Sequence, residues 1–353
     1  MKTWLVTAGL LCLFSGLCLS AVAQTATFEI VSDPLTNTWS NFALSGDGSV
    51  MAANYGGEIY RWTAAGGFQD LGPGDSFSSS IGISYDGSTI ISGHIGVDGF
   101  SSPALWNSSG VVDLGHPLNG CNSLDNSWGS GYGVNWNGNV AVGIAWNCTS
   151  AEGFVWTAQQ GNKSLGHPAG SHSSRATAIS AKANTIVGFW EDPTGPRRPV
   201  RWVNGTHDLF LGSTILGEAS AVTSDGLKIV GQYYSPTSGY GQSFIFSDKK
   251  GLLLMGTIVH TPTDQSFPNG ISDQGTVIGW SGDPFGHGIE AFMWTSPVGM
   301  KRLANVLQDL GANIPAGMTL TTAESISADG TTIVGQYVDS QFHFGNFTAH
   351  ITK

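Results

Sequence analysis

Charged residues are scarce in this sequence, and cations are the scarcest of them. Only 11% of the 353 residues are charged, and 14 lysines and arginines face 25 aspartates and glutamates, which gives a formal net charge of −11. Such a chain repels nucleic-acid phosphates and anionic membrane surfaces. We therefore expect no nucleic-acid partner, and the 41% hydrophobic content excludes an intrinsically disordered chain.

Long apolar runs are absent after the first 23 residues. The N-terminal segment carries Lys2, an apolar run from Trp4 to Leu19 and then Ala21-Val22-Ala23, which is the pattern of a secretory signal peptide. We predict that residues 1–23 are removed and that residues 24–353 form one secreted domain. No later stretch is long enough to predict a membrane-spanning helix.

Cysteine is also rare, with four copies in the whole sequence. Cys12 and Cys18 lie in the predicted signal peptide, so the mature chain keeps Cys121 and Cys148. An even number of cysteines in an oxidising compartment predicts a disulfide between these two.

Motifs that carry chemistry are missing as well. The sequence has no HExxH or CxxC motif, no Walker loop and no complete EF-hand spacing. The segment Ser80-Ile81-Gly82-Ile83-Ser84 lacks the Gly-x-Ser-x-Gly pattern of a nucleophile elbow. We predict no metal, no cofactor and no catalytic residue, and hence no enzymatic activity.

Glycine, by contrast, is abundant, with 50 copies beside 12 tryptophans, and it marks an internal repeat. Turns of the Asp-Gly type recur roughly every 40 to 55 residues, which is near the period of a propeller blade. The seven turn positions are Gly48, Gly87, Gly138, Ala183, Gly226, Gly275 and Gly330.

Three aligned positions, here called columns, precede the turn in every repeat, and the character of their side chains alternates with the two-residue period of a strand. Five residues before the turn every residue is small: Ala43, Gly82, Gly133, Ala178, Ala221, Gly270 and Ser325. The next position is always aliphatic: Leu44, Ile83, Val134, Ile179, Val222, Ile271 and Ile326. A hydroxyl or amide residue follows in every copy. We expect the small residues to face a central channel and the aliphatic residues to pack between blades.

The first six units continue with an Ile-Val-Gly-like strand, a strand that ends in an aromatic residue and a short fourth strand, and the last unit has Ala349 in place of that aromatic residue. Four antiparallel strands per repeat predict an all-β fold, a seven-bladed β-propeller of four-stranded blades. The last unit lacks a fourth strand, whereas Phe28-Glu29-Ile30-Val31 precedes the first unit. We predict that this N-terminal strand completes the last blade and closes the ring. An open β-solenoid is the alternative.

This repeated pattern resembles the HAF-repeat family of bacterial extracellular proteins. The best matching stretches are AESISADGTTIVG, from Ala323 to Gly335, and Ala291-Phe292-Met293-Trp294. The resemblance covers nearly the whole mature chain and implies secretion and a propeller-like repeat. The histidine that the family places two residues before the Phe is replaced here, by Glu290 in this copy, so no role of that histidine carries over.

The loops between the second and third strands vary most, and in a propeller they share one face. They are rich in aromatic residues, and Arg197 and Arg198 form their basic cluster. Exposed rings stack on sugars or anchor protein partners. The predicted ligand-binding residues are Trp146, Trp190, Tyr233, Tyr234, Tyr240, Trp280, Phe285, Tyr337, Arg197 and Arg198.

Together these patterns favour a secreted, monomeric, non-enzymatic propeller that binds a glycan or a protein through its aromatic loop face. Two alternatives stay open. A propeller glycosidase or polysaccharide lyase is one, and a glycosidase needs two convergent carboxylates near the channel mouth. A purely structural surface protein is the other.

Overall fold

The computed structural model describes residues 24–31, 41–75, 80–96, 99–115, 129–146, 151–167, 171, 173–283, 285–286 and 288–352. The predicted signal peptide, residues 1–23, lies outside these ranges, and so do Cys121 and Cys148. Signal cleavage and the disulfide therefore stay predictions. No helix in the described part of the chain is long and apolar enough to cross a membrane.

The described residues form an all-β fold with one short helix, α1 (Leu303–Asp309). Four of the sheets are meanders of four antiparallel strands in chain order. These are β2 (Asn41–Leu44), β3 (Val50–Tyr55), β4 (Glu58–Thr63) and β5 (Gly67–Pro73); β6 (Ile81–Ile83), β7 (Ile90–Ile95), β8 (Ser101–Asn107) and β9 (Gly110–Asp113); β18 (Leu216–Val222), β19 (Ile229–Tyr234), β20 (Gly241–Ser247) and β21 (Gly251–Gly256); and β22 (Gln265–Ile271), β23 (Val277–Asp283), β24 (Gly288–Thr295) and β25 (Gly299–Arg302).

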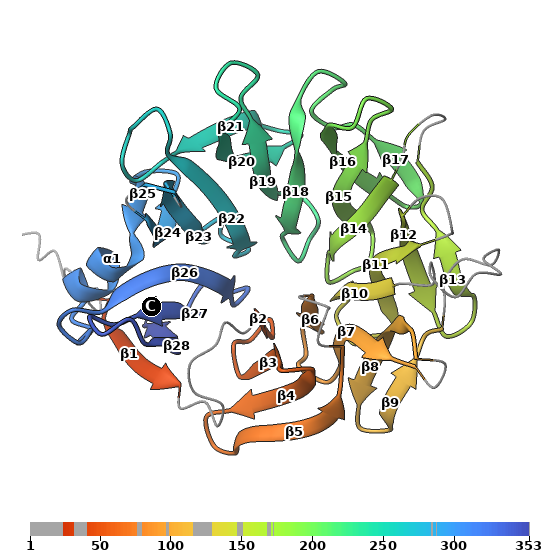
Figure 1. Ribbon diagram of the computed structural model, residues 1–353, viewed down its shortest axis with the longest axis horizontal. Helices are drawn as coiled ribbons and strands as arrows, with labels where there is room; N and C mark the ends of the chain where they lie inside the picture. The colour runs from red at the N-terminus through yellow and green to blue at the C-terminus, as the bar shows by residue number, and fades with distance from the viewer. Residues whose placement is uncertain are drawn as a thin grey trace, which may run out of the picture.

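An eight-stranded sheet contains two further meanders. A single parallel pair of residues, Ala151 and Ser173, joins them. The strands of this sheet are β10 (Gly129–Val134), β11 (Val140–Trp146), β12 (Ala151–Thr157), β13 (Gly161–Ser164), β14 (Ser173–Ile179), β15 (Thr185–Glu191), β16 (Arg197–Val203) and β17 (Thr206–Asp208). The sheets lie around a common centre, and the first strand of each meander lies nearest to it (Figure 1).

The remaining sheet combines the two ends of the chain. It contains β1 (Ala26–Val31), β28 (Phe344–Ile351), β27 (Thr332–Val338) and β26 (Thr319–Ile326), in that order. Strand β1 runs antiparallel to β28 along its whole length, and the rings of Phe28 and Phe347 stack with centroids 5.4 Å apart. The pairing of the N-terminal strand with the last unit is thus present, and it begins two residues earlier than predicted.

The hydroxyl column explains the tight turn after each inner strand. Ser45 donates its hydroxyl to the Asp47 carboxylate over 2.7 Å, and the backbone N–H of Val50 donates to the Ser45 oxygen over 3.0 Å. Gly48 takes a φ of 72°, a conformation that favours glycine. Ser and Asp therefore satisfy the turn's polar groups locally, which supports the turn chemistry that the sequence predicts.

Backbone hydrogen bonds also join the turns of neighbouring meanders around the centre. Gly46 N–H donates to Tyr85 O over 2.8 Å, and Trp136 N–H donates to Ala181 O over 2.9 Å. The turn of the last meander reaches the first in the same way, because Ala328 N–H donates to Gly46 O over 2.8 Å. These bonds fix each inner strand relative to its neighbours.

All seven small residues line the cavity on the central axis, as expected, and they also lie where successive inner strands approach each other. A Cβ on Gly82 would lie 2.5 Å from the carbonyl oxygen of Tyr132 on the next inner strand, and Ala178 and Ala221 pack in clusters between sheets. The small residues are therefore needed where successive inner strands approach each other. The seven aliphatic residues line the hollows along the central axis too, and Leu44, Val134, Ile271 and Ile326 also pack between sheets, as expected.

Candidate functional site

Irregular strand pairing places one residue of each of several inner strands at the central axis. In β10, β14, β18, β22 and β26 the register with the second strand shifts at the same position, six residues before the turn. A bulge of this kind inserts an unpaired residue and redirects its side chain. The inserted residues are Tyr132, Thr177, Ser220, Asn269 and Glu324, and all five line one cavity on the axis.

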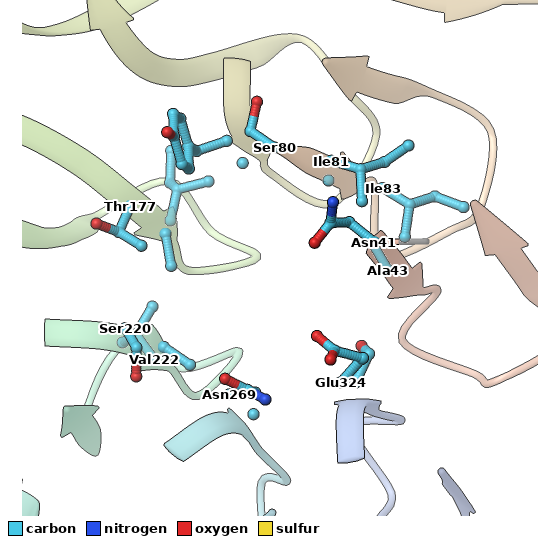
Figure 2. Close-up of a pocket in the computed structure, with 18 of the residues that line it drawn as sticks. Asn41, Ala43, Ser80, Ile81, Ile83, Thr177, Ser220, Val222, Asn269 and Glu324 are labelled. Atoms are coloured by element: carbon cyan, nitrogen blue, oxygen red, sulfur yellow. The ribbon is translucent and has the colours of Figure 1, made fainter. Parts of the chain in front are cut away.

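This cavity, the channel cavity, has a volume of about 410 Å³ and lies at the end of the channel where the inner strands begin. Its wall also includes Asn41, Arg175 and Glu218, and the seven aliphatic residues form its lower part. Figure 2 shows Asn41, Asn269 and Glu324 pointing into the same space. A cavity of this size, whose wall combines polar with apolar groups, suits a small ligand or part of a chain.

Glu324 is the carboxyl group most strongly altered by this environment. Burial in the cavity raises the pKa of Glu324 to about 7, against an opposing hydrogen bond from Thr322. The side-chain amide of Asn269 holds the same strand, because it donates to Thr322 Oγ1 over 3.2 Å and to Ala323 O over 2.9 Å. A carboxyl group with a pKa near neutrality can both take up and return a proton at physiological pH.

Arg175 is the only cation among the described residues that line the channel cavity. Its guanidinium lies between two rings, 5.0 Å from the centroid of Tyr132 and 4.8 Å from that of Phe189. Its contact with the Glu218 carboxylate is long, 3.4 Å, because Arg197 holds the same carboxylate oxygen at 2.9 Å. The rings thus orient a cation that keeps hydrogen-bonding capacity for a ligand anion.

The structure places some of the predicted ligand-binding residues near this cavity. Arg197 holds Glu218 in its wall, and Trp280 stacks on the lining residue Phe267 with centroids 6.2 Å apart. Burial raises the pKa of Tyr234, and the charge of Glu218 raises it further. These residues support the cavity from behind rather than line it.

Other predicted residues have different surroundings. Trp190 is 6% exposed and packs in the core, and hydrogen bonds from Thr194 and Arg198 lower the pKa of Asp192 to about 2, so Arg198 is engaged locally. The other candidates lie at partly or fully exposed positions: Trp146, Tyr233, Tyr240, Phe285 and Tyr337. Phe285 is 95% exposed. They do not join the channel cavity.

The residues with the clearest site geometry were missed by sequence reasoning. Glu324, Asn269 and Arg175 all lie on inner strands, whereas the site was predicted in the loops between the second and third strands. The sequence did contain a signal. The position six residues before each turn varies between repeats, although the positions on either side of it are occupied mostly by small residues. The residues at this position are Phe42, Ile81, Tyr132, Thr177, Ser220, Asn269 and Glu324. A variable position inside a regular repeat indicates a site that the fold does not constrain.

The described residues contain no group of three or more His, Cys, Asp or Glu side chains that could hold a metal ion. The residues around the channel cavity offer two carboxylates, one of which is engaged by arginines. The chemistry that this site supports is therefore proton transfer by Glu324 in a partly enclosed cavity whose lining also contains the cation Arg175.

Sequence comparisons give no relatives. No protein-family model matches the chain, and no curated protein matches it in sequence.

Comparison with solved structures identifies the class of fold, an all-β propeller-like repeat. An oligogalacturonate lyase from Vibrio parahaemolyticus superposes with a TM-score of 0.58 at 11% identity, over 92% of this chain and 97% of that one. An oligogalacturonate lyase in complex with manganese gives 0.55 at 12% identity, over 94% and 98%. The β-propeller domain of the trilobed protease from Pyrococcus furiosus gives 0.55 at 11% identity, over 92% and 95%.

These neighbours correct the prediction of a non-enzymatic binding protein. Two of the chains that share this architecture over more than nine tenths of its length are lyases, so the absence of familiar motifs was no ground for excluding catalysis. Glu324 also lies on an inner strand, away from the loops in which a site was predicted. The identities of 11% and 12% relate the folds and do not transfer any residue's role.

The manganese of one neighbour has no counterpart in the residues found here. In the described part of this chain no cluster of three metal-ligating side chains exists, and the channel cavity contains no histidine or cysteine. The residues present do not fit such an ion, and the chemistry below uses none.

Proposed function

We propose that the protein is a carbohydrate-active enzyme that cleaves acidic oligosaccharides or polysaccharides by β-elimination in the channel cavity. The observation that carries this proposal is Glu324, a carboxyl group with a pKa of about 7 that projects from a bulge into a cavity that also contains Arg175. The likeness in fold to oligogalacturonate lyases supports the same reaction class.

In the proposed reaction Arg175 binds the carboxylate of a uronate sugar. Its charge stabilises the negative charge that develops when the carbon next to that carboxylate loses its proton. Glu324, as the carboxylate, takes up this proton. The electron pair of the broken C–H bond forms a carbon–carbon double bond, and the bond from the β-carbon to the glycosidic oxygen breaks. The leaving oxygen takes a proton, either the one on Glu324 or one from water.

Asn41 and Asn269 complete the polar part of the cavity. The Asn41 amide offers donors and an acceptor to sugar hydroxyl groups, and Asn269, whose N–H groups bond to β26, offers its carbonyl oxygen. The ring of aliphatic residues below them excludes water from one side, which strengthens the interaction between Arg175 and an anion. The residues thus divide into a proton-transfer group, an anion-binding group and orienting groups.

A hydrolase is the second candidate, because Glu218 is another carboxylate in the wall of the same cavity. Glycoside hydrolysis uses one carboxyl group as acid and a second as base or nucleophile. Arg197 and Arg175 both contact Glu218, which keeps it occupied and favours elimination.

Mass spectrometry of the products separates the two reactions. The purified chain is incubated with oligogalacturonate, alginate and a neutral cellulose oligosaccharide. Elimination yields fragments whose masses sum to that of the substrate, and one of them carries an ultraviolet-absorbing double bond. Hydrolysis adds one water per cleavage. Unchanged acidic substrates, with the protein shown to be folded, would refute the proposed function.

The finer features of the fold belong to this proposal too. We infer seven blades, with β1 closing the ring on the last one, because the described strands make seven four-stranded units and β1 pairs with β28. We propose that the protein is secreted as a monomer after removal of residues 1–23, and that it is a HAF-repeat protein. A polysaccharide substrate outside the cell is consistent with secretion.

A further inference from the structure

The opposite end of the channel carries a second hollow, the turn-side hollow, of about 140 Å³. The residue two places before each turn glycine points to this end of the fold. Six of these seven residues line the hollow: Gly46, Tyr85, Ala181, Ser224, Asp273 and Ala328. The seventh is Trp136, which lies beside Tyr85. The aliphatic residues separate this hollow from the channel cavity and line both.

Tyr85 and Trp136 form a stacked pair at the rim of the turn-side hollow. Their ring centroids lie 4.2 Å apart and their planes are inclined by 18°. Tyr85 in turn packs on bare backbone, because a Cβ on Gly46 would lie 2.4 Å from its ring. Two turn-to-turn backbone hydrogen bonds, to Tyr85 O and from Trp136 N–H, hold the pair in place. The pair is therefore a rigid aromatic platform.

Trp136 is 51% exposed although it is held rigidly. An exposed ring of this size that is fixed by its neighbours costs little entropy to bind against. The hollow next to it supplies the hydroxyl group of Tyr85 and the Asp273 carboxylate, which also accepts hydrogen bonds from the Ser224 backbone N–H and hydroxyl over 2.9 and 2.6 Å. A flat apolar face beside hydroxyl and carboxylate groups matches one pyranose ring, which has an apolar face and polar edges.

The charge at this end selects against an acidic sugar. Burial raises the pKa of Tyr85, and the negative charges of Asp273, Asp329 and Asp47 raise it further. The Lys228 ammonium group is directed at the backbone carbonyl of Asp273. A uronate would be repelled here, whereas a neutral or amino sugar would not.

We propose that Trp136, Tyr85 and the turn-side hollow form a second carbohydrate-binding site, which stacks a pyranose ring without negative charge on Trp136. The site lies at the end of the channel opposite to Glu324, so it does not depend on the proposed reaction. A polysaccharide that mixes acidic and uncharged sugars would be held at one end and cleaved at the other.

Calorimetric titration of the intact protein tests the site. The probes are cellulose, xylan and chitin oligosaccharides as neutral ligands, glucosamine oligosaccharides as cationic ligands, and oligogalacturonate. We expect at least one uncharged or cationic probe to bind, and Trp136→Ala to weaken that binding about tenfold or more. The matched control is Trp146→Ala, which removes a tryptophan of similar exposure, 47%, at the other end of the fold and should leave the affinity unchanged.

The arms of the titration distinguish the two sugar types. If the site recognises the amine, Asp273→Asn should lower the affinity for glucosamine oligosaccharides more than the affinity for neutral ones. If it does not, the affinity for neutral probes should stay nearly unchanged in this variant. Glu324→Gln should leave binding at this site intact while it abolishes cleavage. Failure of every uncharged and cationic probe to bind, or equal binding by the Trp136→Ala variant with an unchanged melting temperature, would overturn the proposal.

Discussion

Asn269 donates a hydrogen bond from its side-chain amide to the carbonyl oxygen of Ala323 over 2.9 Å, and so fixes the backbone directly before Glu324. Both Asn269 and Glu324 are inserted residues of bulges, on neighbouring inner strands. The bulge directs the Glu324 carboxyl group into the cavity, and the neighbouring strand holds the bulge in place. Proton transfer needs this kind of fixed position because catalytic geometry tolerates only small displacements.

The raised pKa of Glu324 predicts that the protein loses stability as the pH rises. The pKa is about 7 in the folded chain and near its ordinary value of 4.5 when unfolded. Between these values the folded state binds the proton and the unfolded state does not, so the stabilisation is complete below the unfolded pKa and disappears as the pH passes the folded pKa. The full effect is on the order of 3 kcal/mol.

Denaturant unfolding at about pH 4.5 and about pH 8 measures this effect. The Glu324→Gln variant has no titrating group at this position. The free energy of unfolding of this variant should therefore differ less between the two pH values than that of the wild-type protein. Glu290→Gln, which changes a partly exposed carboxylate paired with Arg302, is the control and should keep the wild-type difference. An identical pH dependence in the Glu324→Gln variant and the wild-type protein would contradict the raised pKa.

Arg175 is predicted to set the preference for acidic substrates. Arg175→Lys keeps the charge but loses the planar guanidinium that Tyr132 and Phe189 orient. We expect KM for oligogalacturonate to rise about tenfold or more in this variant, because the substrate carboxylate loses a paired contact. Steady-state kinetics checks it.

The companion substrate is the methyl ester of the same oligosaccharide, which carries no charge for Arg175 to bind. Its KM should be similar for the wild-type protein and the Arg175→Lys variant. A rise in KM of equal size for the ester and the acid would mean that Arg175 only supports the fold of the cavity wall.

The pairing of β1 with β28 is predicted to stabilise the whole chain. Phe28 is partly buried and stacks on Phe347, a fully buried residue of β28. Phe28→Ala should therefore lower the free energy of unfolding by about 2 kcal/mol. Ile30→Ala on the same strand, where the side chain is 48% exposed, should change it little. Equal effects of the two substitutions in chemical denaturation would argue against this role.

The repeat made much of the fold predictable. The turn glycines fixed the ends of the inner strands, and the missing fourth strand of the last unit pointed to the segment that pairs with β28. Both inferences rest on local rules: the turn needs Ser, Asp and Gly, and an unpaired strand edge needs a partner. Such rules act within a few residues or along one strand.

The channel cavity could not be predicted in the same way, because a bulge is a property of two paired strands. Glu324, Asn269 and Thr177 look like irregular residues in the sequence, and only the register shift against the neighbouring strand shows that they are inserted. The contact of the small residues with the neighbouring inner strand depends likewise on how closely inner strands approach one another. Gly82 shows this approach in its distance from the next strand.

The most direct test of the account is the rate of double-bond formation from oligogalacturonate, measured by ultraviolet absorbance as a function of pH. The wild-type protein should form the unsaturated product, with kcat/KM rising as the pH approaches about 7, where Glu324 becomes the carboxylate. Glu324→Gln should fold normally and lose about a hundredfold or more of this rate. A Glu324→Gln variant that forms the product as fast as the wild type would contradict the assignment of Glu324 as the proton acceptor.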